Sequence, residues 1–96
     1  MRIHVIDYNF KNSVNLVETI EDDMALVYLR ITETGIKGDI SINGKKLSNK
    51  PVFLELLEIP NNQVVLAEIP KGSTLSITLY APDSNQHVGQ LALIGV

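Results

Sequence analysis

Asp83, Ser84 and His87 are the residues whose types and spacing come closest to a catalytic set. A serine nucleophile needs a histidine base and a carboxylate that orients the base, and these groups normally converge at a strained turn beside an oxyanion hole. The sequence has no Gly-x-Ser-x-Gly motif, and the residues after Pro82 have the composition of an ordinary polar turn. We therefore interpret this segment as a hairpin loop and predict neither catalytic residues nor an enzyme.

Metal-ligating patterns are also incomplete. The histidines are His4 and His87, and neither belongs to a His-x-His or His-Glu-x-x-His motif. The chain has no Cys, which excludes thiolate zinc and iron–sulfur sites. The acidic run Glu21–Asp23 lacks the Asp-x-Asn-x-Asn-Gly pattern of a calcium loop, so we interpret it as a solvated turn. The sequence predicts no metal and no other cofactor.

Charge and glycine spacing argue against a nucleic-acid ligand. The 96-residue chain has 8 Lys plus Arg against 11 Asp plus Glu, for a net charge of −3. Proteins that neutralise phosphates are usually basic, and no glycine-rich phosphate loop is present. Lys45 and Lys46 form a small basic patch, which we interpret as protection of a hairpin tip or sheet edge. We expect no nucleic-acid partner.

The elements that must position these residues are strands. In Thr74–Ala81, aliphatic residues alternate with Thr, Ser and Tyr, which is typical of a half-buried strand. Asn43 and Gly44 lie between two alternating segments and predict a type I′ hairpin turn, because both positions need a positive φ. A two-residue loop at this point pairs Ile42 with Lys45.

Other segments carry less regular patterns. The parity of the apolar residues changes within Ile3–Phe10, which predicts a bulge or a crossing between sheets near Val5 and Ile6. We interpret Pro51–Pro60 as a strand, with a short helix as the competing interpretation. The alternation in Met24–Thr32 predicts one face made of Ala25, Val27, Leu29 and Ile31. The remaining predicted strands are Ser13–Ile20, Gln63–Ile69 and His87–Val96.

About eight short strands, with turns every 8–12 residues or so, are typical of a β-sandwich or barrel. We predict one all-β domain over residues 1–96, an antiparallel β-sandwich with a jelly-roll-like topology favoured. We identify no signal peptide and no apolar run near the roughly 18 residues of a membrane span. We therefore expect no membrane partner, and a protein that is cytoplasmic or assembled into a virion.

The sequence has more apolar side chains than one core between two sheets can bury, and this excess is its strongest indication of function. Several predicted strands carry large apolar side chains at both odd and even positions. Odd and even positions point to opposite faces of a sheet, and the two faces cannot line the same core. We predict a homo-oligomer, or a module that docks onto a larger protein assembly. The predicted interface residues are Leu26, Tyr28, Phe53, Leu57, Val65 and Leu66.

The leading functional hypothesis is a non-catalytic structural or assembly module. A phage virion head or tail accessory (decoration) protein fits its small size and β-rich composition, by analogy alone. The alternative is a carbohydrate-binding or adhesin-like module. In that alternative Tyr28 and Tyr80 would contact sugar, and the 21–23 turn would bind calcium.

Overall fold

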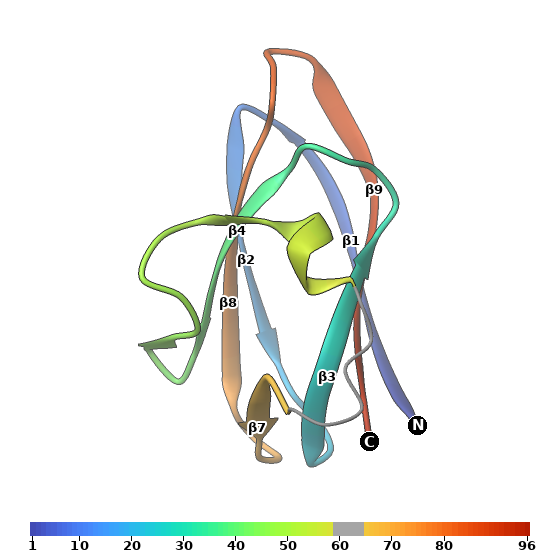
Figure 1. Cartoon of the computed structure of the whole chain (residues 1–96), viewed down its shortest axis with the longest axis vertical. Helices are drawn as coiled ribbons and strands as arrows, with labels where there is room; N and C mark the ends of the chain where they lie inside the picture. The colour runs from blue at the N-terminus through green and yellow to red at the C-terminus, as the bar shows by residue number, and fades with distance from the viewer. Residues whose placement is uncertain (59–64) are drawn as a thin grey trace.

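The computed structural model describes residues 1–58 and 65–96. Within these residues the chain is all-β, and two antiparallel sheets face each other in a sandwich-like arrangement (Figure 1). The strands are β1 (Arg2–Lys11), β2 (Ser13–Thr19), β3 (Met24–Ile31), β4 (Lys37–Ile42), β5 (Lys45–Lys46), β6 (Val52–Phe53), β7 (Ala67–Ile69), β8 (Thr74–Tyr80) and β9 (Gln86–Gly95). A 3₁₀ turn, η1 (Leu54–Leu57), follows β6. No helix in the described ranges is long and apolar enough to cross a membrane.

The nine strands of the described residues form one sheet of four strands and one sheet of five strands. The first sheet has the strand order β1-β9-β3-β7, and the second has the order β2-β8-β4-β5, with β6 paired to β4. One flank of the sandwich is therefore edged by β1 and β2, and the opposite flank by β5 and β7. The chain passes from β1 to β2 through Asn12, whose φ of 67° is one that asparagine tolerates better than most residues.

The core between the sheets follows the period-two pattern most clearly in β8. Leu75, Ile77 and Leu79 are each 0% exposed, and their neighbours in sequence point outward. The predicted strand at this position is confirmed. The predicted hairpin is also confirmed, because Asn43 and Gly44 have φ values of 52° and 83° and Ile42 pairs with Lys45.

The predicted bulge in the first strand is wrong. β1 pairs with β9 in one unbroken register from Arg2 to Lys11. Ile6, Tyr8 and Phe10 point into the core, whereas Ile3 and Val5 lie on the outer face of the sheet and are exposed. The change of parity arises because the strand carries apolar residues on its core face at one end and on its outer face at the other.

The bulge lies in β3 instead. The pairing of β3 with β9 shifts register between Leu26 and Tyr28, so that Leu26 and Leu29 both point into the core. The predicted face shared by Ala25, Val27, Leu29 and Ile31 is therefore wrong for its first half, because Ala25 and Val27 do not share the face of the buried Leu29. An extra residue in one strand reverses the faces of all that follow, and an alternating sequence does not reveal it.

The described part of the Pro51–Pro60 segment contains the two-residue strand β6 and then a short 3₁₀ helix, so the competing interpretation of a short helix holds for Leu54–Leu57. Strand structure ends at Phe53, and η1 follows, with Leu54 buried in the core. The strand prediction is thus wrong beyond Phe53, while residues 59 and 60 lie outside the described ranges. The predicted strand at Gln63–Ile69 is confirmed for Ala67–Ile69, and residues 63 and 64 are also outside the described ranges.

Candidate functional site

A buried histidine joins three segments at the end of the sandwich where the β1–β2 and β8–β9 connections lie. His87 of β9 is 8% exposed, and its ring packs 5.8 Å from the ring of Phe10. Its Nδ1 lies 2.8 Å from Oε2 of Glu33, which belongs to the β3–β4 connection. Its Nε2 lies 2.7 Å from Oδ1 of Asp83, which belongs to the β8–β9 connection. Since carboxylates accept hydrogen bonds, the arrangement favours an imidazolium that donates from both nitrogens.

Further hydrogen bonds hold these carboxylates in place. The Tyr8 hydroxyl donates to Glu33 Oε1 at 2.8 Å, and the Asn85 backbone N–H donates to Asp83 Oδ1 at 3.0 Å. The hydrogen bonds to Glu33 and then Asp83 raise the pKa of His87. The Asn85 N–H, followed by His87, lowers the pKa of Asp83. Burial raises the pKa of Tyr8 to about 12. The cluster therefore ties two loops to β9 by paired charges.

The geometry of this cluster does not provide a catalytic set. Asp83 and His87 do meet, as in a triad, but the second ring nitrogen of His87 is held by Glu33. The ring therefore has no free nitrogen to take a proton from Ser84. The two carboxylates also lie against different ring nitrogens rather than converging on one point. In residues 1–58 and 65–96 no group of three or more His, Cys, Asp and Glu could hold a metal ion.

The His87 cluster makes stability depend on pH with a defined sign. His87 has a folded pKa above its ordinary value of 6.5, so its contribution is complete below pH 6.5 and is lost as the pH rises through the folded value. Asp83 has a folded pKa below 3.8, so its contribution is complete above pH 3.8 and is lost as the pH falls. We expect His87→Gln to destabilise the protein more at about pH 5.5 than at about pH 8.5, as measured by urea unfolding.

His4→Gln is the matched control for this measurement. It removes the other histidine and leaves both carboxylate contacts of His87 in place, so the wild-type difference between the two pH values should persist. An equal loss of stability at both pH values for His87→Gln would mean that His87 is not held as an imidazolium.

A second feature is an apolar patch on the outer face of the four-stranded sheet. Ile3, Ile94 and Tyr28 are cross-strand neighbours and form one row. Val5, Ala92 and Arg30 form the next row. Ile3 is 59% exposed and Val5 is 48% exposed. We call the residues Ile3, Val5, Tyr28, Ala92 and Ile94 the β1–β9–β3 face.

The surface of the β1–β9–β3 face is uneven. A shallow hollow of about 320 Å³ lies beside the second row, and its mixed lining is Val5, Arg30, Ile31, Thr32, Gln90 and Ala92. It forms where the short side chain of Ala92 stands between longer ones. Farther along the same strands the face becomes polar, and Gln90 Nε2 donates to Asp7 Oδ1 at 2.8 Å. The apolar rows therefore form a bounded patch, not a uniformly apolar sheet.

The residues predicted for an interface do not share one surface. Leu26 is 1% exposed and belongs to the core, and Leu57 and Leu66 are partly buried against it. Tyr28 lies on the β1–β9–β3 face. Phe53 is 46% exposed, with Lys37 Nζ 4.8 Å from the centre of its ring, and Val65 is 44% exposed. The prediction missed Ile3, Val5 and Ile94, although the change of parity in the first strand was a signal for Ile3 and Val5.

The side chains proposed for sugar binding are also separated. Tyr28 lies on the outer face of the first sheet and Tyr80 on the outer face of the second, so they cannot form one platform. In the acidic turn, Asp22 lies 3.5 Å from the guanidinium of Arg2. Asp23 Oδ1 accepts the backbone N–H of Lys71 at 2.7 Å. Contacts within the chain thus occupy two of the carboxylates that calcium would need.

Comparisons with known proteins do not place the chain in a family. No protein-family model matches the sequence, and no curated protein or solved structure matches it either.

Proposed function

We propose that this protein is a non-catalytic assembly module that associates with itself through the β1–β9–β3 face. The observation that carries this proposal is the group of apolar side chains in two adjacent cross-strand rows of an outer sheet face, in which Arg30 ends the second row on β3. Full burial of one large aliphatic side chain contributes about 1.5–3 kcal/mol, and contiguous exposed apolar patches mark interaction sites. A sheet face that needed only to meet water would carry polar residues in both rows.

A second copy of the chain fits this face through shape and charge. Ile3 is 59% exposed and lies in the row beside the hollow over Ala92, so a two-fold contact would place Ile3 of one copy in the hollow of the other. Arg30 and Asp7 lie at the border of the patch and supply opposite charges for the rim of the contact.

We infer that the topology is jelly-roll-like. The first strand pairs with the last, β1 with β9, and the second with the last but one, β2 with β8. This is the wrapping expected when a long hairpin folds into two Greek keys. Viral capsid domains and lectin domains both use that fold. The fold alone is therefore equally compatible with a phage virion accessory protein and with a carbohydrate-binding module. The apolar face and the separation of Tyr28 from Tyr80 favour assembly.

Val5→Lys tests the proposed association, and Val17→Lys is its matched control. Both valines are exposed and lie on edge strands, but Val17 is on the outer face of the second sheet. We expect wild-type protein to be oligomeric by light scattering at about 100 μM. Val5→Lys should raise the dissociation constant at least about tenfold, because it desolvates a charge in the contact. Val17→Lys should behave like wild type.

Two outcomes would contradict the proposal. A wild-type protein that stays monomeric throughout the concentration series does not self-associate. Equal dissociation by Val5→Lys and Val17→Lys would place the contact on another surface. Circular dichroism of both variants establishes that the chain remains folded, so that loss of association is not loss of structure.

A further inference from the structure

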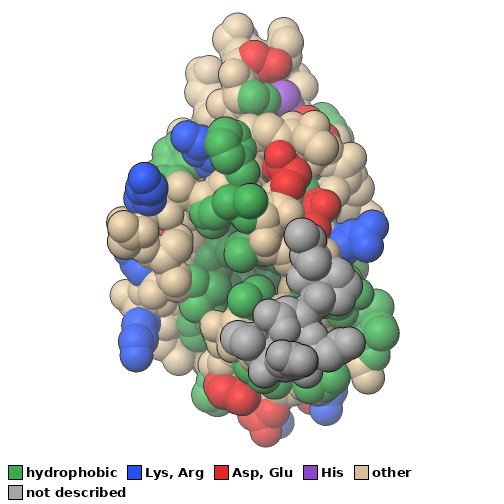
Figure 2. Space-filling model, in the orientation of Figure 1, with side chains coloured by type: hydrophobic (Ala, Val, Ile, Leu, Met, Phe, Trp, Pro, Cys, Tyr) green, Lys and Arg blue, Asp and Glu red, His purple; other side chains and the backbone are tan. Residues whose placement is uncertain are grey.

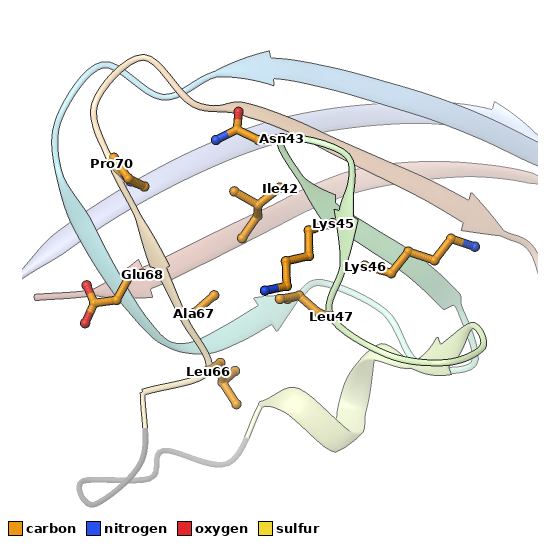
Figure 3. Close-up of a pocket in the computed structure, with 9 residues that line it drawn as sticks. All are labelled: Ile42, Asn43, Lys45, Lys46, Leu47, Leu66, Ala67, Glu68 and Pro70. Atoms are coloured by element: carbon orange, nitrogen blue, oxygen red, sulfur yellow. The ribbon is translucent and has the colours of Figure 1, made fainter.

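An apolar groove lies at the flank of the sandwich edged by β5 and β7 (Figure 3). It has a volume of about 500 Å³, and its apolar lining is Ile42, Leu47, Leu66, Ala67 and Pro70. A smaller hollow of about 140 Å³ continues it, with Leu47 and Leu66 common to both. Figure 2 shows hydrophobic side chains gathered in a hollow on this face, with Lys or Arg side chains along one side.

The groove is bordered by a strand edge that can accept another strand. Within the described residues β7 pairs with β3 alone, through the three residues Ala67–Ile69. Figure 3 shows that the other side of β7 faces β5 across the groove. Extended segments bind to such edges by main-chain hydrogen bonds while alternate side chains enter the adjoining pocket. Pro70 follows β7 and limits the accepting edge to its three residues.

One positive charge lies over this aliphatic floor. The side chain of Lys45 runs beside Leu47 toward the middle of the groove, whereas Lys46 points away from it (Figure 3). Lys46 Nζ pairs with Asp39 at 3.2 Å, and no ion pair of the described residues involves Lys45. Glu68 also borders the groove, but its carboxylate points to the far side (Figure 3). The complementary occupant is therefore aliphatic on one side and carries a carboxylate.

We propose that the groove accepts an extended segment of a partner protein. The segment adds a strand to β7, lays alternate aliphatic side chains over Ile42 and Leu47, and directs an acidic side chain to Lys45. This site lies on a flank of the sandwich and shares no residue with the β1–β9–β3 face, so it is independent of the proposed self-association.

The probe for this site is the blocked hexapeptide Thr-Val-Asp-Val-Thr-Val, titrated into ¹⁵N-labelled protein to about 1 mM. We expect amide chemical-shift changes at Ala67–Ile69 and at Leu47. Lys45→Glu should weaken binding about tenfold, because like charges then meet at the rim. Lys11→Glu, an exposed lysine at the end of β1, is the matched control and should bind as wild type does.

Charge reversal on the peptide completes the experiment. A peptide with lysine in place of its aspartate should bind wild type about tenfold more weakly and regain affinity for Lys45→Glu. The same titration in Val5→Lys should show unchanged binding, which separates this site from self-association. The absence of shifts in β7 would overturn the proposal, as would equal affinity for the two peptides. Binding of octanoate without binding of the peptide would overturn it too, by assigning the groove to a small amphiphile.

Discussion

Leu93→Ala is expected to lower the free energy of unfolding by about 3–4 kcal/mol. Leu93 is 0% exposed and lies in β9, which is flanked by β1 and β3 in the centre of the first sheet. The substitution removes buried methyl groups and leaves a cavity that strands held on both sides cannot close. Urea denaturation measures the change, with an unaltered m-value as the sign that the unfolding transition is the same.

Ile94→Ala is the control for Leu93→Ala, one residue along the same strand. Ile94 lies on the outer face and is half-buried, so we expect a loss below about 1.5 kcal/mol. Both substitutions are made in Val5→Lys, so that self-association does not add to the stability of either. Equal losses for the two variants would contradict the assignment of Leu93 to the core face and Ile94 to the outer face.

Gly89→Ala is expected to cost about 2–3 kcal/mol through overcrowding and a lost hydrogen bond. A Cβ at Gly89 would overlap Oγ1 of Thr32 and lie 2.6 Å from the hydroxyl of Tyr8. Tyr8 is 3% exposed and cannot swing into solvent, so its hydroxyl must leave Glu33. Thermal or urea unfolding gives the loss directly.

Two further variants test whether overcrowding causes the loss in Gly89→Ala: Val88→Ala, and Gly89→Ala combined with Thr32→Ala. Val88 directly precedes Gly89 in β9 and is 68% exposed, so its truncation should change stability by less than about 0.5 kcal/mol. Thr32→Ala removes the oxygen that the new methyl group would overlap. Gly89→Ala combined with Thr32→Ala should therefore lose less than the sum of the single losses. Strict additivity would show that the overlap is not the cause.

Periodicity predicted the strands well wherever one face alone is apolar. β8 is the best case, because its outward residues are Thr, Ser and Tyr and leave no doubt about which face enters the core. The Asn43–Gly44 hairpin was equally predictable, since few residue pairs accept two successive positive φ values. In both cases a local rule is sufficient, and no partner strand has to be known.

The period-two rule gave wrong predictions in β1 and β3, because these strands carry apolar residues on both their core face and their outer face. In β1 the outward Ile3 and Val5 were indistinguishable from core residues, and a bulge was inferred to bring them inside. In β3 a real bulge after Leu26 went unrecognised, because apolar residues on both sides of it preserve the alternation. Parity identifies a core face when the other face is polar, and these strands lack that contrast.

The His87 cluster shows most directly how little the spacing of residues along the chain says about contacts between distant segments. Asp83 and His87 are four residues apart, and their contact follows from a loop that returns into β9. Glu33, the second partner, is 54 residues away and reaches His87 because the β3–β4 connection lies at the same end of the sandwich. No sequence motif indicates the contact between Glu33 and His87. Without Glu33, the residues Asp83, Ser84 and His87 resembled an incomplete catalytic triad.

The place of β9 in its sheet has a consequence for how the chain acquires its structure. β9 is the last strand in sequence, yet it lies between β1 and β3, with residues 2–11 paired to residues 86–95. Neither neighbour has its central hydrogen-bonding partner until residues 86–95 have been synthesised. Closing so long a loop is entropically costly before any contact is gained, so folding should take on the order of milliseconds to seconds once β9 has been made. Until then the backbone of β1 and the aliphatic face that it carries are open to the wrong partner.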